Sequence, residues 1–135
     1  FMAQNKIVAR YADGRVHKGI TMDFIPGKET FHIMPSVSAQ GEKLMEIRCD
    51  ELKAVFFVRD YAGNPDYSDK KSFEPGQPVM GRKIKVRFKD GELLVGATSA
   101  YQPGRAGFFL APADPQSNIE RCYIVTRSTQ DVQLI

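Results

Sequence analysis

The stretch from Lys83 to Pro112, KIKVRFKDGELLVGATSAYQPGRAGFFLAP, decides how this chain of 135 residues is read. A shift of 77 positions toward the N-terminus places it, without a gap, on Lys6 to Pro35, KIVARYADGRVHKGITMDFIPGKETFHIMP. Eleven of the thirty aligned positions carry the same residue in both stretches. Self-similarity at a fixed spacing indicates a repeated structural unit. The sequence therefore predicts a fold that is built twice.

Each stretch predicts short antiparallel strands. Apolar and basic residues alternate along 83–89, and a period of two is typical of a strand with one buried and one solvent-exposed face. Asp90-Gly91 predicts a two-residue hairpin turn of type I′. Gly96 falls inside the next strand, where a glycine indicates a bulge or a sharp bend. Pro103-Gly104 then predicts a corner before a third strand.

The correspondence continues to the C-terminus and defines the expected domains. It covers residues 6–58 and 83–135, each with about five short strands and no helical periodicity. Residues 59–82 between the copies are rich in proline and glycine but also contain several large apolar residues. We expect an ordered connecting segment there, packed across the joint of the two copies. The predicted fold class is all-β, with two tandem five-stranded small barrels packed as a pseudo-dimer.

The residues of each copy resemble the Sm-like barrel, a member of the SH3-like group. The resemblance rests on Val86–Phe88, Asp90-Gly91, Gly96, Tyr101 and Phe108–Leu110, with their counterparts in the first copy. It implies a bent five-stranded antiparallel sheet that closes on itself. The short N-terminal helix usual in the Sm family is missing, so the resemblance extends to architecture only.

A closer resemblance covers most of the chain. Residues 52–67, 81–118 and 120–125 are similar to an uncharacterised bacterial domain family, found alone or fused to regulatory modules. No activity is settled for that family. The resemblance therefore implies a bacterial protein domain and says nothing about chemistry.

Composition and motifs argue against several functional classes. The net charge of +3 is mild for a dedicated nucleic-acid binder. Cys49 and Cys122 have no CxxC partner, and with two histidines the soft ligands are too few for a zinc site. His17 and His32 align with Leu94 and Phe109, so we expect them to have structural roles in the barrels.

Nucleotide-loop and metalloprotease motifs are absent from the sequence, as is an apolar run near the ~18 residues that span a bilayer. We therefore expect no enzymatic activity, no catalytic residue, no metal, no cofactor and no membrane contact. Two reduced thiols favour a cytoplasmic location.

Two features supply candidate binding residues. The first is a basic stripe on one strand face, spaced so that it would follow a phosphate backbone or protect a strand edge: Lys83, Lys85, Arg87 and Lys89. The second is the pair of Pro-Gly corner loops, each with an aromatic and a basic residue: Phe24 and Lys28 in the first copy, Tyr101 and Arg105 in the second. The other interpretation, which the composition of these loops favours, is a plain turn held by an aromatic residue under the proline, with a solubilising cation.

These observations favour a non-enzymatic bacterial binding or adaptor module. We expect it to engage a protein partner through strand edges and loops, and self-association through the same edges is also open. The alternative is binding of single-stranded RNA through the basic stripe and the corner loops. Steep salt dependence would identify the RNA-binding alternative.

Overall fold

Strands dominate the computed structural model, which describes residues 5–35, 43–63, 66–67 and 69–135. The first half contains β1 (Asn5–Tyr11), β2 (Val16–Thr21), β3 (Thr30–Pro35), β4 (Met45–Arg48), a 3₁₀ turn η1 (Cys49–Glu51) and β5 (Leu52–Val58). The second contains β6 (Arg82–Phe88), β7 (Leu93–Thr98), β8 (Gly107–Pro112), β9 (Ile119–Val125), η2 (Thr126–Ser128) and β10 (Thr129–Leu134). The all-β prediction is confirmed.

The two halves have matching element boundaries. β6, β7 and β8 begin and end 77 positions after β1, β2 and β3, and η2 lies 77 positions after η1. β9 and β10 correspond in the same way to β4 and β5, with small differences at their ends. We call two residues 77 positions apart twins.

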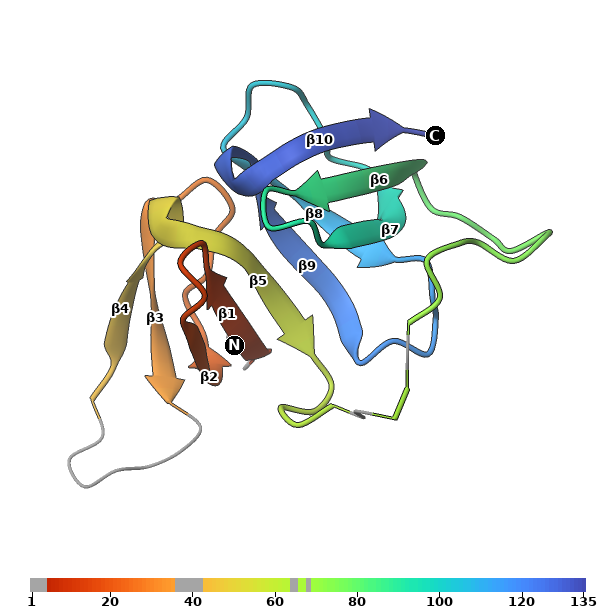
Figure 1. The fold of residues 1–135 in the computed structure, drawn as a ribbon. Coiled ribbons are helices and arrows are strands. Elements are labelled where there is room, and N and C mark those ends of the chain that lie inside the picture. Colours follow the sequence, from red (N-terminus) through yellow and green to blue (C-terminus); the bar gives the residue numbers. More distant parts are fainter. Residues whose placement is uncertain (1–4, 36–42, 64–65, 68) are drawn as a thin grey trace.

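The strands form one open antiparallel sheet (Figure 1). Its order is β10-β6-β7-β8-β9-β5-β1-β2-β3-β4, so each half contributes five neighbouring strands. Two separate closed barrels are not what this order shows. The reason lies at the centre, where β5 of the first half pairs with β9 of the second, from Ala54 opposite Ile124 to Val58 opposite Ile119. We call this β5–β9 pair the joint.

The joint connects two hydrophobic cores. One core contains the inward residues of the second half together with Ala54 and Phe56 of β5. The other contains the inward residues of the first half together with Tyr123 and Val125 of β9. Each central strand therefore packs one face against its own half and the other face against the opposite half. This arrangement explains why every residue of β5 is buried.

The hairpin turns differ from the predicted type. Type I′ needs positive φ at both central residues, but among the described residues only glycines have positive φ, at +96° for Gly14 and +94° for Gly91. Gly14 donates its N–H to the Tyr11 carbonyl at 3.1 Å, and Tyr11 donates to the Arg15 carbonyl at 2.9 Å. A type I turn closed by a left-handed glycine has this pattern.

The glycine inside the second strand of each half allows two strands to approach closely. A methyl group on Gly19 would overlap the carbonyl oxygen of Met34, and one on Gly96 would overlap that of Ala111. These glycines lie where β2 and β7 pair with β3 and β8. The pairing of β1 with β2 and of β6 with β7 continues through these glycines without a register shift, so the predicted bulge does not form in those pairs and the glycine serves close backbone packing.

A buried lysine also connects the two halves. Lys53 of β5 donates from Nζ to Oδ2 of Asp90 at 2.6 Å and to a carboxylate oxygen of Glu92. Both acids belong to the hairpin turn between β6 and β7, in the other half. The Lys53 side chain is 11% exposed, while those of Asp90 and Glu92 are 54% and 44% exposed. The ammonium is thus enclosed, and its counter-charges stand at the surface.

The described part of the connecting segment packs mainly on the second half. The Tyr67 hydroxyl and the Lys70 N–H both donate to Oδ2 of Asp114. The Gln77 amide donates to the Ala113 carbonyl at 2.8 Å. On the other side, Lys18 of β2 donates to the Tyr61 carbonyl at 3.0 Å. The described part of the segment thus contacts both halves.

Candidate functional site

A groove of about 710 Å³ lies where the two halves meet. The corner loop after β2, at Gly27–Thr30, and its twin after β7, at Gly104–Ala106, form two of its sides. The segments around η1 and η2 complete the lining. We call this feature the junction groove.

The two corner loops have the same local structure. Lys28 donates its N–H to the Ile25 carbonyl at 3.1 Å, and the twin Arg105 donates to the Gln102 carbonyl at 3.3 Å. Each turn needs a left-handed glycine, with φ of +83° at Gly27 and +87° at Gly104. The Pro-Gly pairs were therefore correctly interpreted as corners. Repetition of one turn places Lys28 and Arg105 at the same groove.

Twin hydrogen bonds attach these loops to the 3₁₀ turns. The Cys49 N–H donates to the Glu29 carbonyl, and the Thr126 N–H donates to the Ala106 carbonyl, each at 2.9 Å. Each bond joins two lining segments that belong to the same half. The backbone on both sides of the groove is therefore fixed before a ligand binds, which lowers the entropy cost of ordering these loops on binding.

The floor of the groove is apolar and comes from β9. Tyr123 and Val125 line it, and Tyr123 is only 3% exposed. Burial raises the pKa of the Tyr123 phenol, while a hydrogen bond from the Gly27 backbone acts in the opposite direction. A methyl group on Gly107 would overlap the Tyr123 ring. The ring therefore packs closely against the backbone of β8.

Phe24 belongs to the same packing. Its ring makes edge contacts with Phe31 and Phe57 of its own half, at centroid distances of 5.0 and 5.6 Å. It also contacts Tyr123 of the other half at 5.2 Å. The structure thus uses this predicted binding residue to close the joint. Its twin Tyr101 packs on Phe108 within its own half, at 4.8 Å.

Charged side chains surround the floor unevenly. The wall from the second half carries two cations, Arg105 and Arg127, and none of its lining residues is acidic. The wall from the first half carries both signs: Lys28, Arg48, Glu29, Glu46 and Asp50. One wall of the groove therefore carries only positive charges, and the other carries both signs.

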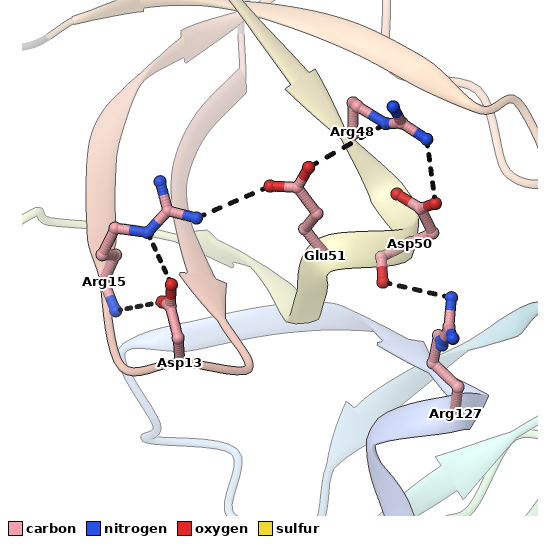
Figure 2. Close-up of polar contacts among 6 residues, drawn as sticks. All are labelled: Asp13, Arg15, Arg48, Asp50, Glu51 and Arg127. Carbon is pink, nitrogen blue, oxygen red and sulfur yellow. Dashed lines mark hydrogen bonds and ion pairs between the residues drawn. The ribbon is translucent and has the colours of Figure 1, made fainter.

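Ion pairs already occupy part of the first wall (Figure 2). Arg48 lies 3.1 Å from Asp50 and 3.9 Å from Glu51, and Glu51 in turn lies 3.5 Å from Arg15. Arg127 donates a long hydrogen bond of 3.5 Å to the Asp50 carbonyl, next to this series of ion pairs. Within the described part of the chain, neither Lys28, Arg105 nor Arg127 makes an ion pair. These three are the cations that the groove offers to a ligand.

The thiols offer no nucleophile near neutral pH. Burial, with a smaller contribution from Asp50, raises the pKa of Cys49 at the groove to about 11. Burial raises the pKa of Cys122 to about 12. Both thiols are free and are therefore protonated under ordinary conditions.

The predicted structural histidines differ from their apolar twins in environment. His32 is partly exposed, and its Nδ1 lies 2.7 Å from Oδ2 of Asp23. Asp23 also accepts the His32 backbone N–H at 2.9 Å, so this pair braces the connection between β2 and β3. His17 packs edge-on against Tyr11 at 5.4 Å. Neither histidine lines the junction groove.

The basic stripe lies away from the groove. It alternates with buried Ile84, Val86 and Phe88, as the pattern predicted. β6 has a neighbour on each side, so the stripe does not protect a free edge. Two of its cations have partners within the chain: Lys83 lies over the Phe73 ring at 5.0 Å, and Arg87 donates to the Gly91 carbonyl at 3.2 Å.

Of the predicted residues, Lys28 and Arg105 line the same groove, the basic stripe stays together outside it, and Phe24 and Tyr101 are engaged in packing. The structure adds Arg127, Arg48 and Tyr123, which the sequence did not single out. No residue motif marks these positions, because their twins are Asp50, Val125 and Glu46. Only the pairing of β5 with β9 assembles them.

Within the described residues, no cluster of three or more potential ligands is placed to hold a metal ion. The described helices are single 3₁₀ turns, and none has the length and apolar character to cross a bilayer. No curated protein and no solved structure matches the chain. A family model does match it, over residues 3–135. The chain therefore belongs to the family of unknown function DUF6982.

Proposed function

We propose that this chain is a non-enzymatic binding module that holds an acidic, extended segment of a partner protein in the junction groove. The observation that carries the proposal is the cationic wall of the second half, where Arg105 and Arg127 make no ion pair with any described residue, and Lys28 on the opposite wall makes none either. A charged rim around an apolar floor is typical of protein-recognition surfaces.

The dimensions of the groove fit this ligand class. A volume of about 710 Å³ accommodates several residues of an extended peptide. Carboxylates of the segment would pair with the arginines of the second wall. Arginine binds carboxylates through two parallel hydrogen bonds, which adds geometric specificity.

RNA is the rival ligand, and the contacts favour it less. Base stacking needs an exposed aromatic face. The Tyr123 ring is buried, and the rings of Phe24 and Tyr101 are engaged in packing contacts. The basic stripe, which is the other part of the RNA hypothesis, does not reach the groove.

A random peptide library displayed on phage tests the proposal without a known partner. We expect selection on the wild-type protein to enrich peptides with an excess of aspartate and glutamate. The winning peptide, synthesised with a fluorescent label, should bind at least tenfold more weakly to the variant Arg105→Glu with Arg127→Glu. Absence of enrichment, or winners that bind this variant equally well, would overturn the proposal.

A matched variant, Lys85→Glu with Arg87→Glu, makes the same charge change outside the groove. It should bind the winning peptide within about twofold of wild type, because a change outside the contact surface acts only through long-range charge. Labelled single-stranded RNA is titrated in parallel. RNA binding that falls steeply with salt and is lost in this stripe variant would establish the rival instead.

A further inference from the structure

The joint contains two kinds of side chain. Those that point into the core of their own half are Val55 and Phe57 on β5, and Cys122 and Ile124 on β9. Those that cross into the core of the opposite half are Ala54 and Phe56 on β5, and Tyr123 and Val125 on β9. The crossing residues make the two halves one unit, and all four are buried.

The twins of these two sets differ in polarity. The four own-core residues named above have apolar twins: Val132 and Leu134 on β10, Met45 and Ile47 on β4. The four crossing residues have polar twins: Asp131 and Gln133 on β10, Glu46 and Arg48 on β4. All four polar twins are exposed. A fifth crossing residue, Val58, is the exception, because its twin Ile135 is apolar and exposed.

β10 and β4 are the two free edges of the sheet. They are also the twins of the two strands that pair in the joint. In a second copy of the chain, β4 therefore presents the backbone edge that β10 would need to repeat the joint between molecules. Free edges with matching backbone are the usual route to unwanted strand pairing.

We propose that β10 and β4 form a latent head-to-tail interface for a second copy of this chain, and that the polar crossing positions keep it closed. If the edges paired as the joint does, Asp131 and Gln133 would enter the core of the first half of the neighbour. Glu46 and Arg48 of the neighbour would in return enter the core of the second half of the first molecule. Burial of such groups without partners is costly, so the chain stays monomeric.

The polarity thus limits assembly to the pairing made once within each chain. The sequence left self-association through strand edges as a possibility. On this proposal the backbone of both edges would permit it, and the polar side chains oppose it. This inference is independent of the proposed peptide ligand, because it concerns pairing of the backbone edges of β4 and β10.

Exchange of each polar residue for its own twin tests the inference. The variant Glu46→Tyr, Arg48→Val, Asp131→Ala and Gln133→Phe places the residues of the joint at the free edges. Sedimentation velocity should show the wild type as a monomer at all concentrations. The variant should form species of several chains whose size increases with concentration, because a head-to-tail contact repeats.

Two half variants separate this contact from general stickiness. One carries the β4 changes and the other the β10 changes, and each keeps one polar edge. Each alone should remain monomeric, and an equimolar mixture should form a species of two chains that does not grow further. The single changes Glu46→Tyr and Gln133→Phe provide a second pair, mixed in the same way, should the larger changes impair folding.

Three results would overturn the inference: a wild-type protein that already self-associates, half variants that assemble alone as well as they do together, or mixtures of both pairs that stay monomeric.

Discussion

Removal of the two carboxylates that face Lys53 is the sharpest test of how the halves are held together. The change is Asp90→Asn with Glu92→Gln, which keeps side-chain size and hydrogen-bonding oxygens but removes both negative charges. The Lys53 ammonium lies 2.6 Å from Asp90 and only 11% of its side chain is exposed. In the variant, the positive charge stays enclosed without a counter-charge.

The expected cost follows from burial. Loss of one partner of a fully buried ion pair costs about 3–5 kcal/mol. Here the acids are half-exposed, so water compensates part of the loss, and we expect about 2–3 kcal/mol. Lys53→Met removes the buried charge itself and leaves two carboxylates that can turn to water. We expect that change to cost about 1 kcal/mol or less, since an apolar chain of similar length replaces the lysine stem.

Urea unfolding at neutral pH measures both free energies. The order is the decisive result, because the double amide variant should be less stable than Lys53→Met. The twin residue Asp13 provides a matched control: it pairs at the surface with Arg15, at 2.8 Å. Asp13→Asn should therefore lower the urea midpoint far less than the double amide change does. Equal costs at the two turns, or a larger cost for Lys53→Met, would refute the assignment of Lys53 as a buried clamp.

The same contact predicts a pH dependence. The hydrogen bond from Lys53 lowers the pKa of Asp90 below its ordinary value of 3.8. A carboxylate with a lowered folded pKa contributes stability that is fully present above the unfolded value and is lost as pH falls through the folded value. The free energy of unfolding of the wild type should therefore lose this contribution as the pH falls below about 4. Lys53→Met should lose less stability over the same range.

Three further predictions concern other contacts. Gly107→Ala should destabilise the chain by about 1–3 kcal/mol in urea unfolding, because the new methyl group overlaps the Tyr123 ring, and a neutral result would mean that the ring is loosely held. Phe24→Ala should lower the free energy of unfolding by about 2–4 kcal/mol, because the Phe24 ring packs against both Phe57 of β5 and Tyr123 of β9. A loss below about 1 kcal/mol would contradict that role. The hydrogen bond to Asp114 raises the pKa of Tyr67 to about 12, so Asp114→Asn should move the Tyr67 phenol titration, followed as the absorbance difference from Tyr67→Phe, back toward 10.

Local structure was predictable because it depends on local chemistry. The strand predicted at 83–89, the turns at the Asp-Gly pairs and the corners at the Pro-Gly pairs all occur at the predicted positions. The turn type was mispredicted, because an Asp-Gly pair suits both the type I′ turn and the type I turn with a left-handed glycine. The spacing of 77 fixed which elements correspond but not how the two sets are joined.

The joint itself left a trace in the sequence that periodicity alone did not resolve. Residues 54–58, AVFFV, form a continuous apolar run, whereas their twins 131–135, DVQLI, alternate between polar and apolar residues from Asp131 to Leu134. A strand buried on both faces has the first pattern, and an edge strand has the second. The difference indicates that β5 lies inside the sheet and β10 outside, but not which strand covers β5. That choice depends on packing between residues far apart in the chain.

The groove follows from the same asymmetry. Had both copies kept the same residues, the twin of Tyr123 would be an aromatic residue and the twin of Arg127 a cation, and each half would carry an equivalent surface. Instead, Glu46 and Asp50 occupy those twin positions on the open side of the first half. The aromatic residue lies where the other half covers it, and the acids lie where solvent reaches them. The junction groove therefore owes its apolar floor and its unequal walls to the positions at which the two halves differ in sequence, while the shared residues supply the turns that frame it.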